Sequence, residues 1–139
     1  MELAIVTALV AVATIAGLIW KRGQGRVVKV SGHTISEDYR TPGKTVLLQF
    51  TTEFCSPCAQ LKPRLEKIAN FRSDVEFRAI DAVEHLDLAN SLGIRSTPTT
   101  LVVSPTGEIT ARITGVAAAE VFINAIDGRP STTYEEITI

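Results

Sequence analysis

The feature that most constrains this chain is a Cys-x-x-Cys pair lying between an apolar run and a helical pattern. Cys55 and Cys58 are its only two cysteines, three positions apart. Residues 45–51 form a largely apolar run rich in β-branched residues, typical of a central strand buried on both faces. Residues 58–70 carry apolar residues at helical spacing. A strand feeding into a helix here would place Cys55 at the helix N-terminus.

This placement favours redox chemistry over the two other uses of such a pair. Unpaired backbone N–H groups and the helix dipole stabilise a thiolate at a helix N-terminus. A zinc site would need further ligands, and the only histidines, His33 and His85, are not at ligand spacing from the cysteines. A purely structural disulfide would close too small a loop to stabilise the fold much. We therefore expect a redox-active dithiol that needs no metal and no cofactor.

The first twenty-two residues differ sharply from the rest. Between Leu3 and Trp20 there is no charged residue and no proline, and about eighteen apolar residues can cross the hydrocarbon core of a bilayer as a helix. The alternative, a secretory signal peptide, would have a basic start, a shorter apolar stretch and a small-x-small cleavage site. Here the only early charge is Glu2, and the run ends in Leu-Ile-Trp-Lys-Arg. Residues 1–22 are therefore predicted to be a retained transmembrane anchor.

The charges that flank this segment predict its orientation. Lys21, Arg22, Arg26 and Lys29 follow it closely, and no lysine or arginine precedes it. The positive-inside rule places the more basic flank in the cytoplasm. We therefore expect a single-pass protein of the cell membrane whose C-terminal domain is cytoplasmic.

The rest of the chain has the pattern of one α/β domain. Residues 23–127 suit a single folding unit, and residues 128–139 are polar and predicted to be a flexible tail. A net charge of −1 and 6% aromatic residues give no sign of nucleic-acid binding. Strands are predicted at residues 26–30, 45–51, 75–80, 99–103 and 108–114, and helices at 58–70, 84–92 and 117–126. The order predicts a mixed central sheet flanked by helices.

Several linked motifs in residues 28–126 resemble the thioredoxin family. The stretch 53–58, EFCSPC, follows a strand where the family commonly has Trp-Cys-Gly-Pro-Cys. Pro63, five residues after the second cysteine, is at the position of the family's kinking proline, and residues 93–99, GIRSTPT, resemble the segment that carries its cis-proline. Other matching positions are Ile80-Asp81, Gly107 and Gly115. With its apolar segment, the chain also resembles membrane-anchored thioredoxin-domain proteins of actinobacteria.

The resemblance implies roles for individual residues. Cys55 would be the attacking cysteine and Cys58 the resolving one. Pro98 would be in cis and face the disulfide, with the backbone of Thr97 turned toward a bound extended peptide. The residues expected to bind substrate are Phe54, Ser56, Pro57, Thr97 and Pro98.

Three positions depart from the family pattern. The family's buried aspartate, six residues before the first cysteine, is Gln49 here, and the lysine that pairs with it aligns with Phe77. Losing both members of a buried charge pair is self-consistent, because either one alone would be costly. The usual tryptophan before the first cysteine is Phe54. A neutral amide at position 49 cannot accept a proton from the resolving cysteine, as the aspartate is thought to do.

These observations predict a membrane-tethered thiol–disulfide oxidoreductase that acts on protein disulfides and takes electrons from a partner such as a reductase. Two alternatives stay open. Because of Gln49 and Phe77, the domain could be a tethered docking module with little turnover. It could also be a disulfide oxidase or isomerase facing outside the membrane.

Overall fold

The computed structural model describes residues 1–22, 25–30 and 32–130. The elements follow the predicted order, with one added 3₁₀ helix, η1. The helices are α1 (Glu2–Arg22), η1 (Glu37–Tyr39), α2 (Ser56–Phe71), α3 (Leu86–Ser91) and α4 (Ala119–Ile126). The strands are β1 (Arg26–Lys29), β2 (Thr45–Thr51), β3 (Val75–Asp81), β4 (Thr99–Val103) and β5 (Ile109–Thr114).

The five strands form one mixed sheet in the order β1-β5-β4-β2-β3. β2 and β3 are parallel, and the other three pairings are antiparallel. β2 lies inside the sheet and its residues 46–50 are all buried, which confirms the prediction of a central strand covered on both faces. The predicted hairpin is β4 and β5, with an irregularity in the register at Val102 and Val103.

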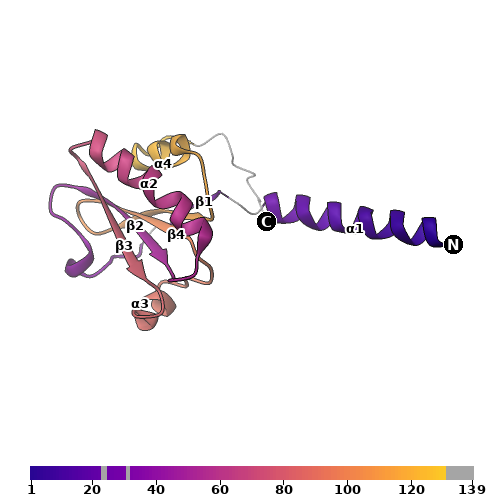
Figure 1. The fold of residues 1–139 in the computed structure, drawn as a ribbon. Helices are drawn as coiled ribbons and strands as arrows, with labels where there is room; N and C mark the ends of the chain where they lie inside the picture. The colour runs from indigo at the N-terminus through magenta and orange to yellow at the C-terminus, as the bar shows by residue number, and fades with distance from the viewer. Residues whose placement is uncertain (23–24, 31, 131–139) are drawn as a thin grey trace.

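Two apolar layers cover the two faces of the sheet. Because side chains alternate along β2, successive residues of this strand belong to opposite layers. Leu47 packs on one face under α2 and α4, together with Leu61, Leu65 and Phe122. Figure 1 shows α2 and α4 side by side over the sheet. The other face is covered by α3 and the segment around η1, and its core residues include Ile35, Val46, Leu48, Phe50 and Ala89. Because side chains alternate along a strand, Gln49 faces the layer of α2.

Some boundaries differ from the predicted ones. α2 begins at Ser56, two residues before the helical spacing that starts at residue 58. Cys55 is therefore at its N-terminus as predicted, and Pro57 is in its first turn, where a missing N–H costs nothing. α3 is shorter than predicted and is followed by Gly93, with a φ of 64°. Residues 33–41, for which the sequence predicted no element, contain η1 and a bridge from Thr34 to Glu108.

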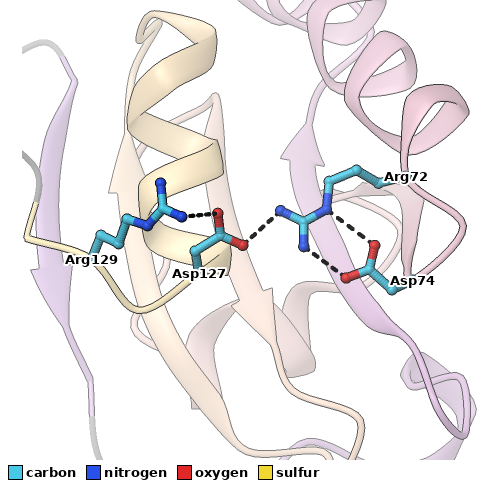
Figure 2. A network of polar contacts seen from close by, with 4 residues as sticks. All are labelled: Arg72, Asp74, Asp127 and Arg129. Atoms are coloured by element: carbon cyan, nitrogen blue, oxygen red, sulfur yellow. Dashed lines mark hydrogen bonds and ion pairs between the residues drawn. The ribbon is translucent and has the colours of Figure 1, made fainter.

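An ion-pair network joins the C-terminal ends of α2 and α4 (Figure 2). The guanidinium of Arg72 contacts Asp74 at 2.7 Å and Asp127 at 2.6 Å, and Arg129 lies 3.9 Å from Asp127. The hydrogen bond from Arg72 is the main cause that lowers the pKa of the Asp74 carboxyl. The network therefore links the end of α2 to the end of α4.

α1 is apolar and exposed along its whole length. Its length and composition would let it cross a membrane, and a signal sequence near the N-terminus would have the same properties. Residues 23–24, at the start of the predicted domain, and residues 131–139 of the predicted tail lie outside the described residues. At the start of that tail, the Arg129 N–H donates to the Asn124 carbonyl at 2.8 Å.

Candidate active site

The two cysteines lie in the turn between β2 and α2 and in the first turn of α2. Cys55 is the N-cap of α2, and a disulfide joins it to Cys58 with a Cα–Cα distance of 5.2 Å. The backbone N–H of Cys58 donates to the Cys55 sulfur over 3.2 Å. In the dithiol form, a sulfur at this position would accept N–H groups of the first helical turn, which favours its anionic state.

The two sulfurs differ in their access to solvent. Cys58 is 3% exposed, whereas Cys55 is only partly buried. Phe54 beside it is 92% exposed, and Ser56 and Pro57 are exposed as well. A partner sulfur can therefore approach Cys55 from solvent, whereas Cys58 is shielded.

Gln49 lies directly beneath the cysteine turn. Its side chain is buried, with 1% of the residue exposed, and its amide Nε2 donates to the Cys58 carbonyl oxygen over 3.2 Å. This confirms that position 49 is buried beside the cysteines, as the resemblance implied. The sequence predicted that position 49 lacks a proton acceptor. It did not predict this hydrogen bond, because the bond depends on how α2 packs on β2.

The strand partners of Gln49 supply no charge. Gln49 pairs with Ala79 on β3 and with Thr100 on β4. Phe77 pairs with Leu47 instead and packs against the apolar layer of α2. The hydroxyl of Thr100 is buried and has no hydrogen-bond partner among the described residues. Sequence reasoning missed Thr100, whose place opposite Gln49 follows only from the β2–β4 register.

Pro98 lies at the same end of the sheet as the cysteine turn. The Thr97–Pro98 peptide bond is cis, as the resemblance implied. Pro98 is buried, and its carbonyl accepts a hydrogen bond from the Gly115 N–H at 2.8 Å. The next residue, Thr99, pairs with Phe50 on β2. Residues 97 and 98 therefore lie level with the end of β2, where the chain turns toward Cys55.

One carboxylate, Glu53, lies close to the disulfide in the sequence. Glu53 is exposed two residues before Cys55. Across the described ranges, no cluster of three or more His, Cys, Asp or Glu could hold a metal ion. His85 precedes α3 and contacts the ring of Tyr39 edge-on, with centroids 6.3 Å apart. Thiol chemistry at Cys55 and Cys58 is what this arrangement can support.

Comparison with known proteins places this geometry in a family. The thioredoxin family model matches residues 26–128, which is most of the chain. The chain belongs to the thioredoxin family. A thioredoxin of Streptomyces clavuligerus is 32% identical over 91 residues, covering 66% of this chain and 84% of that protein. A putative thioredoxin 2 of Streptomyces coelicolor is 38% identical over 63 residues, covering 45% of this chain and 47% of that protein.

Solved structures agree with this family assignment. A mutant thioredoxin from Halobacterium salinarum superposes with a TM-score of 0.60 at 26% identity, covering 71% of this chain and 86% of the other. The mixed sheet flanked by helices is therefore a thioredoxin fold. The chain spans about half the length of several of the curated relatives it matches. The family match begins at residue 26, so α1 lies outside it.

Proposed function

We propose that this thioredoxin-family protein is a thiol–disulfide oxidoreductase held at a membrane by α1. One observation carries the proposal: a partly exposed Cys55 caps α2 and receives the backbone N–H of Cys58. This contact stabilises a thiolate at the sulfur that a partner can reach. The family assignment and the Cys55–Cys58 pair support the same activity.

The proposed reaction is two successive thiol–disulfide exchanges. The Cys55 thiolate attacks one sulfur of a partner disulfide, forms a mixed disulfide and releases the other partner sulfur as a thiolate. The Cys58 sulfur, as thiolate, then attacks the Cys55 sulfur and expels the second partner thiolate. Two electrons pass from the dithiol to the partner, and the Cys55–Cys58 disulfide results. A second dithiol, such as that of a reductase, returns the protein to its reduced state.

The proposed substrate contacts surround the exposed face of this disulfide. Phe54 would provide an apolar surface beside Cys55, and the backbone around Thr97 would bind an extended segment of the partner. The exposure of Phe54 and the position of Thr97 just before β4, level with the end of β2, support these roles. The proposed substrate-binding residues are Phe54, Ser56, Pro57, Thr97 and Pro98.

The proposed location is the cell membrane, with the thioredoxin domain in the cytoplasm. The uninterrupted apolar helix α1 supports the anchor, and Lys21 and Arg22 in its last turn support the orientation.

Insulin reduction in the presence of dithiothreitol tests the activity. The full chain in detergent should accelerate insulin precipitation well above the uncatalysed rate, and Cys55→Ser should abolish that acceleration. A Cys58→Ser variant should form mixed disulfides that persist, because the resolving sulfur is gone. If the wild-type chain and Cys55→Ser give equal rates, the proposed activity is wrong.

A second candidate function is a tethered docking module that binds protein partners with little turnover. Gln49 favours it, because a neutral amide is not basic enough to take a proton from the resolving thiol, and its Nε2 instead donates to the Cys58 carbonyl. The same assay separates the two functions. If the protein were a docking module, it would bind a peptide partner, but its rate of insulin precipitation would be no higher than that of Cys55→Ser.

A further inference from the structure

Four strands of the sheet have their active-site ends in one row. Phe50 near the end of β2 pairs with Thr99 at the start of β4, and Thr99 pairs with Thr114 at the end of β5. Thr114 in turn pairs with Arg26, the first residue of β1. The cysteine turn follows β2, so the chain enters the domain at the sheet end that carries the disulfide. Figure 1 shows β1 and the beginning of α2 on the same side of the domain.

The entry point is attached firmly to this end of the sheet. The Gly25 N–H donates to the Thr114 carbonyl at 2.8 Å. Gly25 is buried and has a φ of 74°, and a Cβ built there would lie 3.4 Å from the Ala117 Cβ. The positive φ favours glycine at this position. The attachment of the anchor to the domain therefore begins at Gly25 and not further along β1.

The distance from α1 to the disulfide is limited by chain length. Two residues separate Arg22 from Gly25, and three Cα–Cα steps span at most about 11 Å. Three strand spacings, from β1 to β2, add about 14 Å. The end of β2, from which the cysteine turn follows, thus lies within roughly 25 Å of the end of α1. A domain of this size is about 30 Å across, so an exit at the opposite end would place the cysteines much further away.

We infer that the Cys55–Cys58 pair works beside the membrane surface, on a disulfide or dithiol of a second protein anchored in the same membrane. This inference rests on the proposed anchoring and exchange activity. Confinement of both partners to one surface raises their effective concentration, but only where geometry lets the two sites meet. The exposed Arg26 at the entry point, with Arg22, would also draw this end toward anionic lipid headgroups. The preferred partner cysteines therefore lie close to the bilayer surface, within reach of the cysteine turn that follows β2.

Two synthetic single-span peptides can test this in vesicles of phosphatidylcholine and phosphatidylglycerol. The near probe carries a disulfide loop directly after its span. The far probe carries the same loop after a helical spacer of about 40 residues, which adds about 60 Å. The reduced full-length protein, reconstituted with either probe, should reduce the near probe at least about tenfold faster. Thiol labelling and gel shift would follow the reaction.

A matched variant carries the same 40-residue spacer between residues 23 and 24 of the protein. This variant should lose the preference for the near probe or reverse it, because its cysteines are lifted from the surface. Equal rates on both probes for the wild-type protein would overturn the inference, and so would an unchanged preference in the spacer variant.

Two further measurements separate this inference from the proposed function. Reduction of a soluble aromatic disulfide reports the dithiol alone, and its rate should be the same for the wild type and the spacer variant. An inert soluble reaction would refute the oxidoreductase activity itself. Flotation of the protein with the vesicles reports the anchor, and its failure would refute the anchoring together with the inference. If the soluble reaction and the flotation both succeed, the preference for the near or the far probe tests only whether the cysteines work beside the membrane surface.

Discussion

The side-chain amide of Gln49 donates a hydrogen bond to the backbone carbonyl of Cys58 over 3.2 Å. This bond connects the centre of the sheet to the first turn of α2, which holds both cysteines. The amide is neutral at every accessible pH, so it positions the turn without adding a charge to it. In this chain the side chain buried under the dithiol donates a hydrogen bond to the backbone and does not accept a proton.

Gln49→Asp should reveal that difference, with Gln49→Asn as a neutral control of matched length. We expect Gln49→Asn to cost about 1 kcal/mol of unfolding free energy through a weakened hydrogen bond. Gln49→Asp should cost a few kcal/mol at neutral pH, because Phe77 offers a buried carboxylate no cation. Burial raises the pKa of such a carboxyl, so its cost should grow as pH rises from about 4 toward that pKa. Chemical denaturation at pH 5 and pH 8 would measure both.

The same pair of variants tests the chemistry. A carboxylate at position 49 can accept the Cys58 proton, so Gln49→Asp should resolve a preformed mixed disulfide faster than the wild type, and Gln49→Asn should not. Single-turnover quench experiments would measure this step without interference from other slow steps. Equal resolution rates in all three proteins would show that proton acceptance at this position does not limit the reaction.

The two cysteines of the reduced protein should differ in reactivity. Cys55 is partly exposed at the helix start and Cys58 is 3% exposed, so iodoacetamide near pH 7 should label Cys55 at least about tenfold faster. Mass spectrometry of the digested protein would give both rates. In Cys58→Ser, Cys55 should still be labelled rapidly. Because this variant cannot form the Cys55–Cys58 disulfide, it measures the reactivity of Cys55 by itself. Similar rates at both sulfurs would contradict the assignment of Cys55 as nucleophile.

The proposed orientation can be checked with reporter fusions. A reporter that is active only in the periplasm, fused to the C-terminus, should give no signal, and a cytoplasmic reporter should be active. Moving the basic residues that follow the anchor to its N-terminal side should invert both results. An antibody blot would control for expression. An active periplasmic reporter on the unaltered chain would place the domain outside the membrane and leave the fold unaffected.

Arg72→Gln should weaken the ion-pair network that links the ends of α2 and α4. The variant loses the contacts of Arg72 with Asp74 and Asp127, and we expect the Tm to fall by roughly 5 °C or less at pH 7. Arg72 lowers the pKa of Asp74 in the folded protein, so its contribution is present above about pH 4 and is lost as pH falls further. The difference in Tm between wild type and variant should therefore shrink in acid. Arg95→Gln, at an exposed arginine outside the network, should show neither effect in calorimetry.

Local patterns in the sequence were enough to predict the elements and the redox pair. The apolar run of β2, the helical spacing after Cys58 and the glycine at position 93 all act over a few residues, so they can be read without knowing the fold. The ordered motifs around the cysteines and Pro98 likewise identified the family. Boundaries differed by a residue or two, as at α3, which runs from Leu86 to Ser91 rather than over residues 84–92.

What only the tertiary structure decided depends on which strands lie side by side. The bond from Gln49 to the Cys58 carbonyl requires α2 to fold back over β2, and Thr100 lies opposite Gln49 because of the β2–β4 register. The entry of the chain from α1 at the sheet end that carries the cysteines follows from the pairing of β1 with β5. Such pairings join residues far apart in the chain: Gln49 and Thr100 are 51 positions apart, and Arg26 and Thr114 are 88. They are set by how the whole sheet buries its apolar faces, and no local propensity contains that information.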